Sequence, residues 1–310
     1  MMKRLCYLLL STLYPLFCNT AAASVVKTKA PPYAITRLDS GTVFYRGEIS
    51  KGSRRHLLRY LNAATKTLVV TSEGGSPDEG MLMAEELRRR NIRLVVDKYC
   101  MSSCANYLFL AAPQKSVKPG SLVGFHGGPL GSLSEEKERQ FERGALSSHS
   151  MHGEGLQNHL DKLAIRELEF FSRIGVDREL YRDVDKVILA SVAGKSRAPV
   201  LHGRLTLATA KGKWDYGVSD KELDRLGRRM AELDRKKIRY TVQGEIERPG
   251  TAPDTAYFPS RATLEKYGVM GIQSYPYPAD KAELKKMVRK VFDGDVKIIA
   301  DFESQENPAG

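Results

Sequence analysis

The sequence predicts an α/β fold, in which parallel strands alternate with helices. Short apolar runs rich in β-branched residues occur at residues 42–49, 67–72 and 92–97, and each has the length of one strand. Between the second and third runs, residues 77–90 carry apolar side chains at helical spacing. Strands and helices that alternate along a chain form βαβ units, with the helices packed on the sheet.

The N-terminal segment has the pattern of a secretory signal peptide. Lys3 and Arg4 precede an apolar run from Leu5 to Phe17, and three alanines at residues 21–23 follow as a small-residue cleavage site. The apolar run is shorter than the roughly 20 residues of a transmembrane helix. We therefore expect residues 1–23 to be removed, residues 24–37 to be a linker, and the protein to be periplasmic or secreted. An uncleaved membrane anchor is the alternative.

Export would leave two cysteines in the mature chain, Cys100 and Cys104. Their spacing of four on a helical turn places the two Cα atoms about 6 Å apart, which a disulfide tolerates. An oxidising compartment favours their pairing, so we predict a local disulfide. Two buried thiols that act as small hydrophobic groups are the alternative.

The chain is basic, with a formal net charge of +12. Basic and acidic residues are interleaved, and no nucleic-acid motif accompanies them. The pattern indicates a solvated surface and no nucleic-acid partner, while peripheral contact with an anionic membrane stays open.

Polar or glycine-rich turns follow three of the predicted strands. Gly74 and Gly75 follow residues 67–72, Ser102 and Ser103 follow residues 92–97, and His126 ends a strand at 121–126. The carboxyl ends of parallel strands meet at one edge of a sheet, where α/β proteins place their sites. A serine at a helix N-terminus with a histidine in reach suits acyl transfer. Taken singly, each feature is also typical of a helix cap or a turn.

Four ordered segments resemble the proteolytic subunit of the Clp protease and, more broadly, the ClpP/crotonase superfamily. They are "VVTSEGGSPDEGMLMAEEL", "YCMSSCANYLFLAA", "SLVGFHGGPLGS" and "GRLTLATAKGKWDYGVSD", and together they span about residues 42–220. The resemblance implies a ClpP/crotonase-like βαβ superhelix over residues 38–225. Residues 226–310 then form a small C-terminal α+β appendage of unknown role.

The resemblance implies a catalytic site on this chain. Ser103 corresponds to the nucleophile and His126 to the general base, and the backbone N–H groups of Gly75 and Cys104 correspond to the oxyanion hole. The activity implied is that of an ATP-independent serine endopeptidase that cleaves peptides or unfolded proteins. We expect no cofactor, no metal and no ATPase partner, and a homo-oligomer.

The third member of a catalytic triad has no carboxylate at the position that the resemblance implies. The register of "RELYRDVDKVILAS" places Val187 opposite the expected carboxylate, and Asp185, or else Asp183, substitutes only if the helix shifts. Two alternatives therefore remain open. One is a non-catalytic relative that binds peptides or serves as a scaffold, and the other is a crotonase-type acyl-thioester enzyme.

Two further segments carry predictions. Residues 132–160 are polar and contain three histidines, and we expect an arm involved in oligomer formation rather than a metal site. Residues 281–292 form a basic amphipathic helix with its apolar residues on one face. This helix either packs on the core, which we favour, or lies on an anionic membrane.

Overall fold

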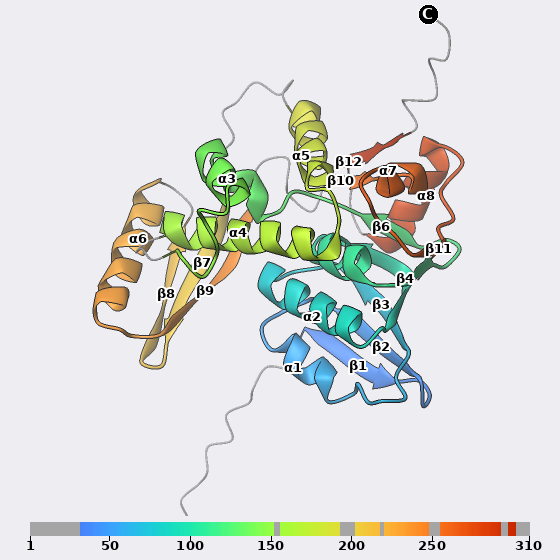
Figure 1. The fold of residues 1–310 in the computed structure, drawn as a ribbon, viewed down its shortest axis with the longest axis horizontal. Coiled ribbons are helices and arrows are strands. Elements are labelled where there is room, and N and C mark those ends of the chain that lie inside the picture. Colours follow the sequence, from blue (N-terminus) through green and yellow to red (C-terminus); the bar gives the residue numbers. More distant parts are fainter. Residues whose placement is uncertain are drawn as a thin grey trace, which may run out of the picture. The chain divides into compact units, whose positions relative to one another are not determined.

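Parallel strands form the centre of the structure (Figure 1). The computed structural model describes residues 32–151, 156–192, 202–217, 220–247, 255–292 and 297–301, so the predicted signal peptide lies outside the described residues. The main sheet has seven strands in the order β1-β2-β3-β4-β5-β11, with β6 also paired to β4. Their bounds are Tyr33–Arg37, Thr42–Gly47, Thr67–Ser72, Arg93–Met101, Lys115–Val117, Ile272–Ser274 and, for β6, Leu122–Gly124.

The pairing confirms the predicted α/β class. Only β1 and β2 are antiparallel, and every other pair in this sheet is parallel. The predicted strands at 42–49, 67–72 and 92–97 are observed as β2, β3 and β4. The apolar run of β3 is buried from Leu68 to Ser72, because helices and neighbouring segments cover both of its faces.

Helix α2 (Pro77–Arg89) covers one part of the sheet, as predicted. Its start is set by Ser76, whose hydroxyl accepts a hydrogen bond from Glu79 N, and by proline in the first turn. Arginines in its last turn lie at the negative end of the helix dipole. Its buried side chains, Met81, Met83, Ala84 and Leu87, belong to the main hydrophobic core.

The other helices of the main core lie on either side of α2 in the sequence. They are α1 (Ser53–Leu58), the π-helix η1 (Cys104–Phe109), the 3-10 helix η2 (Pro129–Ser132), α3 (Glu135–Glu142), α4 (Leu156–Ile174), α5 (Glu179–Val192) and α7 (Arg261–Lys266). The predicted polar arm at 132–160 is thus occupied by α3 and the start of α4. Among the described residues, no helix is both long enough and apolar enough to cross a membrane.

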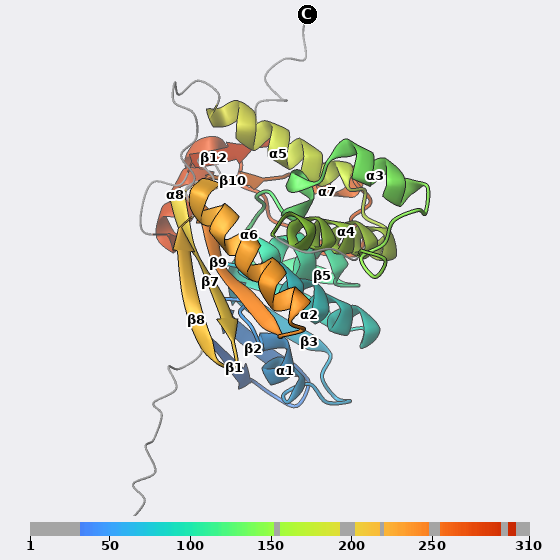
Figure 2. The same ribbon diagram turned by 90° about the vertical axis from the view of Figure 1, so that its left-hand side faces the viewer.

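A second, three-stranded sheet has its own hydrophobic cluster. Its order is β8-β7-β9, from Gly212–Gly217, His202–Thr209 and Tyr240–Glu247, and all pairs are antiparallel. Helix α6 (Asp220–Arg235) lies along it (Figure 2) and contributes Leu226, Met230 and Leu233 to the cluster. The segment beginning at Gly203 is therefore an antiparallel hairpin.

The C-terminal segment packs against the main sheet. Strands β10 (Thr255–Phe258) and β12 (Lys297–Ala300) pair with each other, and β11 pairs with β5. Helix α8 (Lys281–Val291) buries Leu284 and Val288 in a cluster that includes Met101. This confirms that the apolar face of the basic helix packs on the protein. All described residues belong to one compact unit that begins at Pro32, and a domain boundary near residue 225 stays a prediction.

A buried lysine lies at the end of the π-helix. Lys115 on β5 is 1% exposed, and its Nζ donates a hydrogen bond of 2.9 Å to the carbonyl of Leu110. Leu110 caps η1, so the ammonium group satisfies a carbonyl that the helix leaves without a partner. Burial, and then the nearby charge of Arg88, lower the pKa of Lys115 to about 7.

The lowered pKa of Lys115 predicts a pH dependence of stability. The unfolded chain binds this proton below about pH 10.5 and the folded chain only below about 7, so stability falls as the pH is lowered through that interval. Relative to Lys115→Met, the free energy of unfolding of the wild type should rise by about 4 kcal/mol between pH 7 and 10. Urea unfolding at both pH values measures it.

The control for this measurement is the exposed Lys66. A Lys66→Met variant should show a pH profile parallel to that of the wild type. A parallel profile for Lys115→Met as well would contradict the prediction.

Candidate functional site

The serine turn joins β4 to η1. Ser102 has a positive φ of 54°, a conformation rarely adopted by residues other than glycine, and its N–H donates to Gly124 O at 3.0 Å. Ser103 follows as the N-cap of the π-helix and is 3% exposed. The backbone hydrogen bond from Ser102 to the end of β6 thus fixes the turn within the sheet.

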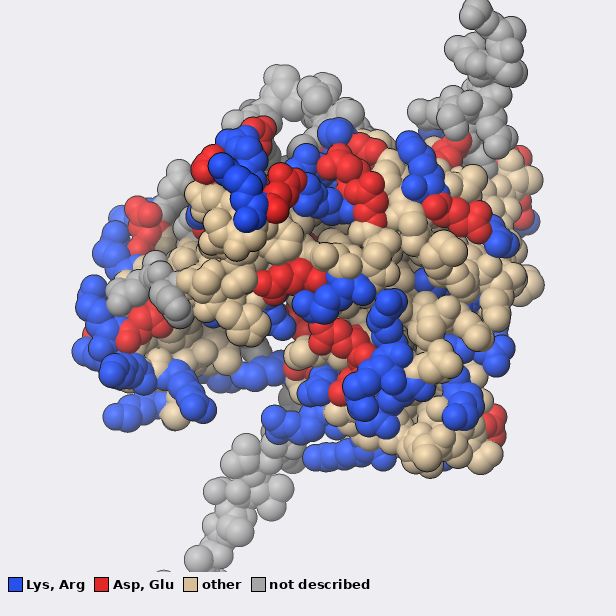
Figure 3. All heavy atoms as spheres, in the orientation of Figure 1, with Lys and Arg blue, Asp and Glu red and all other residues tan. Residues whose placement is uncertain are grey.

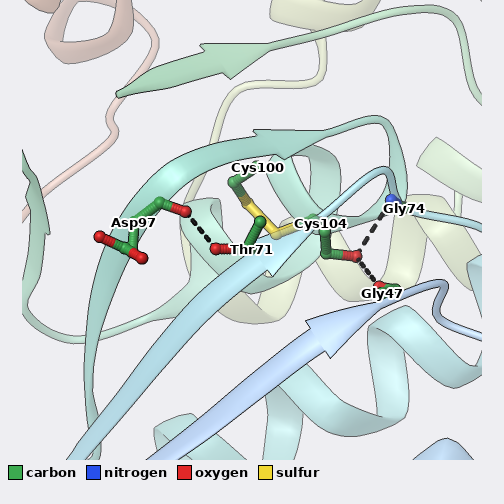
Figure 4. The surroundings of a disulfide bond; sticks show 7 residues. Gly47, Thr71, Gly74, Asp97, Cys100 and Cys104 are labelled. Carbon is green, nitrogen blue, oxygen red and sulfur yellow. Dashed lines mark hydrogen bonds between the residues drawn. A yellow bond between two sulfur atoms is a disulfide. The ribbon is translucent and has the colours of Figure 1, made fainter. Parts of the chain in front are cut away.

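A disulfide closes the turn, as predicted (Figure 4). Cys100 lies on β4 and Cys104 begins η1, with their Cα atoms 5.2 Å apart, and both are fully buried. Near this bridge, side chains of the neighbouring strand β3 form hydrogen bonds to β2 and to β4. Ser72 donates to Gly47 O at 2.7 Å and accepts from Gly74 N at 3.1 Å, while Thr71 donates to Asp97 O.

The glycine turn after β3 lies directly against the serine turn. Gly74 has a φ of 93°, and a Cβ atom added there would come within 2.6 Å of Met101 O and 2.7 Å of Ser103 N. No side chain fits at such distances, so only glycine allows the two turns to approach. The structure therefore brings together the glycine pair and the serine pair that the sequence singled out.

The backbone of Gly75 bears on the predicted oxyanion hole. Its φ is 135°, and it forms an isolated parallel bridge with Ile49. Within the described ranges, no acceptor receives a hydrogen bond from the Gly75 N–H. The N–H of Cys104 is the first of η1, where a helix supplies no acceptor. These are the two groups predicted as an oxyanion hole, and that role stays a prediction.

The hydroxyl of Ser103 bonds to backbone rather than to a base. Its Oγ donates to the carbonyl oxygen of Gly75 at 2.6 Å. Between the described groups of Ser103 and His126 there is no hydrogen bond. A carbonyl oxygen does not take up the proton that a nucleophilic serine must release, so the partner of the Ser103 hydroxyl in this structure is not a base.

His126 lies just after β6, on a loop attached to η1. The amide of Asn106 donates to His126 O at 3.2 Å, and the ring Nδ1 lies 2.9 Å from Gly127 O. Because a carbonyl only accepts, Nδ1 carries the proton in this contact. Burial lowers the pKa of His126, so the ring is neutral near pH 7.

The two candidate aspartates have different surroundings. Asp185 on α5 lies against the loop after His126, since a Cβ at Gly127 would be 2.2 Å from its Oδ1. Asp183 accepts hydrogen bonds from the hydroxyl of Tyr267 and from Lys186, and the Tyr267 bond is the main reason that the pKa of Asp183 is lowered. Asp185 is thus the candidate placed beside the histidine loop.

One buried carboxyl group was missed in the sequence. Glu167 on α4 is fully buried and accepts hydrogen bonds of 2.7 Å from the Tyr107 hydroxyl and from Leu130 N. Burial raises its pKa to about 7. Its spacing from Ala164 and Phe171 places it on the buried face of the helix, which is a signal that the sequence does contain. Glu167 ties the histidine loop to η1.

The described residues contain no group of three or more histidines, cysteines, aspartates or glutamates that could hold a metal ion. Of the three histidines in residues 132–160, His152 lies outside the described residues.

Comparisons with known proteins give structural neighbours only. No protein family matches the chain, and no curated protein matches it. Enoyl-CoA hydratases from Mycobacterium avium subsp. paratuberculosis K-10, Mycobacterium smegmatis and Bacillus anthracis align with 34%, 50% and 53% of this chain. The aligned parts cover 55%, 62% and 78% of those chains. Identities are 10%, 8% and 11%, and TM-scores are 0.24, 0.29 and 0.25.

The predicted serine endopeptidase activity is wrong. These three solved structures are described as enoyl-CoA hydratases, not as serine endopeptidases. The glycine and serine turns lie together as the resemblance implied, and the catalytic roles of Ser103 and His126 stay predictions.

The contact between the two turns predicts unequal effects of two glycine substitutions. Gly74→Ala should destabilise the protein by at least about 3 kcal/mol, because its Cβ meets backbone atoms that cannot yield. Gly120 has a similar positive φ of 76° but open space around it, so Gly120→Ala should cost only about 1 kcal/mol. Equal losses in urea unfolding would show that the close approach is unimportant.

The disulfide should contribute measurably to stability. For a separation of four residues, the loss of chain entropy in the unfolded state is worth about 2 kcal/mol. The double variant Cys100→Ala/Cys104→Ala should lose about that much free energy of unfolding. Dithiothreitol should lower the stability of the wild type and leave the variant unchanged, whereas equal sensitivity of both would refute the assignment.

Proposed function

We propose that this chain is a non-catalytic binding protein that takes peptides or unfolded protein segments as ligands. The observation that carries the proposal is the hydrogen bond from Ser103 Oγ to Gly75 O at 2.6 Å. A serine that is 3% exposed and bonded to a carbonyl serves the structure of the turn. The disulfide and the buried contact of Gly74 hold the two turns together.

The ligand class follows from the groups around Gly75. This residue is exposed, and its N–H is available to a carbonyl oxygen of an extended peptide. Acidic side chains flank it, since Glu73 is exposed one position before Gly74 and Glu48 lies beside Gly75. The arrangement favours extended segments that carry lysine or arginine next to the bound carbonyl.

A peptide array with fluorescence anisotropy tests the proposal. The wild type should bind lysine- or arginine-containing peptides, and Ser103→Ala should bind them equally well. Glu73→Gln should weaken binding about fivefold, while Glu135→Gln, on the exposed surface of α3, should not.

A second assay on the same purified protein gives the outcomes that would contradict the proposal. A fluorophosphonate probe should form no adduct with the folded protein. Covalent labelling of Ser103, or peptide binding that requires its hydroxyl, would overturn the proposal.

A second candidate is an acyl-thioester enzyme, and one observation favours it. Gly75 N–H and Cys104 N–H lie on the two turns that contact each other, and neither has an acceptor within the described turn or helix. Two such donors stabilise negative charge on a thioester oxygen. Hydration of an α,β-unsaturated acyl thioester by the wild type, together with no peptide binding, would favour this candidate over the first.

A further inference from the structure

Nine of the 49 lysines and arginines of the chain come from two segments that share one surface. Residues 51–66 and 82–93 contain nine lysines and arginines and only two acidic residues, Glu85 and Glu86. We define the basic patch as Lys51, Arg54, Arg55, Arg59, Lys66, Arg88, Arg89, Arg90 and Arg93. Figure 3 shows lysine and arginine atoms gathered over α1 and the C-terminal end of α2. Basic residues from two separate segments of the sequence thus lie on one surface.

Internal ion pairs account for only part of this patch. Glu86 binds Arg54, Arg89 and Arg90, and the Arg54 contact at 2.8 Å joins α1 to α2. Glu85 pairs instead with Arg173 of α4. Within the described structure, the remaining side chains of the patch have no ion-pair or hydrogen-bond partner. They are Lys51, Arg55, Arg59, Lys66, Arg88 and Arg93, and all six are exposed.

A row of aromatic rings borders the patch. The Tyr33 ring stacks on Tyr45 with centroids 5.5 Å apart, and His56 packs edgewise against Tyr33 and Tyr60. These rings contact one another, so their faces are not spread out for the stacking of nucleic-acid bases. Tyr33 and Tyr60 are half-buried and Tyr45 is fully buried. Tyrosine rings are enriched at the headgroup level of membrane interfaces.

We propose that the basic patch binds the phosphate headgroups of an anionic membrane. Arginine pairs with phosphate more effectively than lysine does, and arginine forms seven of the nine basic residues. Disulfides are typical of proteins in oxidising compartments, which are bounded by membrane surfaces. The patch lies on helix surfaces and on the first residues of strands, so it suits a partner with an extended surface. This inference does not depend on the serine turn.

Co-sedimentation with phosphatidylglycerol–phosphatidylcholine vesicles tests the proposal. Arg55, Arg59 and Arg88 make no contacts that support the fold, so the triple variant Arg55→Gln/Arg59→Gln/Arg88→Gln should fold normally. It should lose about 100-fold in vesicle partitioning. Binding of the wild type should disappear in vesicles of phosphatidylcholine alone and fall steeply with added salt.

Helix α8 provides a matched control. Lys285, Lys286 and Arg289 are also exposed, and Lys285→Gln/Lys286→Gln/Arg289→Gln removes the same charge from another basic surface. This variant should keep vesicle binding within about threefold of the wild type. An equal loss in both variants, or no vesicle binding by the wild type, overturns the proposal. Tighter binding of single-stranded DNA than of vesicles, lost in the first variant, would also overturn it.

Discussion

The close contact between Gly74 and the serine turn is the constraint on which the rest of the site depends. Backbone atoms of Met101 and Ser103 leave no room for a side chain at residue 74. The same contact places the Gly75 carbonyl where the Ser103 hydroxyl reaches it at 2.6 Å. The disulfide then fixes the serine turn from the opposite side, between β4 and η1. The serine turn, which the disulfide holds, and the glycine turn, which has no room for a side chain, therefore meet at one edge of the sheet.

Hydrogen bonds of buried polar groups also fix the surrounding loops. Glu167 holds the Tyr107 hydroxyl and Leu130 N, so α4, η1 and the loop after His126 share one hydrogen-bonded carboxyl group. Tyr181 on α5 donates to Asn106 O, and the Asn106 side chain donates to His126 O. These bonds pair most of the buried polar atoms of the network, although the Asn106 Oδ1 atom is buried without a hydrogen-bond partner in the described structure. The histidine loop is thus positioned by structure, independent of any contact with Ser103.

Much of the fold could be predicted from the sequence, because its signals are local. The apolar runs of β3 and β4 and the capped, amphipathic α2 specify their own secondary structure. Glycine and serine turns at successive strand ends also predicted the juxtaposition of Gly74 and Ser103. The hairpin of β7 and β8 is local, with Thr209 opposite Gly212, but it was not predicted because the segment was interpreted through the family resemblance alone. The pairing of β7 with β9 joins residues more than 30 positions apart, which local patterns do not reveal.

The hydrogen bond from Ser103 to the Gly75 carbonyl also could not be predicted, and here the physical reason is different. Motif spacing specifies which side chains approach one another, but a rotation of one hydroxyl decides whether Ser103 bonds to a carbonyl or to an imidazole. Likewise, net charge and its order in the sequence do not reveal that α1 and the end of α2 share a surface, because only tertiary contacts join them. These contacts include the buried Leu57 and Met83 and the ion pair between Arg54 and Glu86. In this chain, long-range contacts determine which groups surround Ser103 and which basic residues share a surface. Local sequence patterns determine only the helices and strands on which these residues lie.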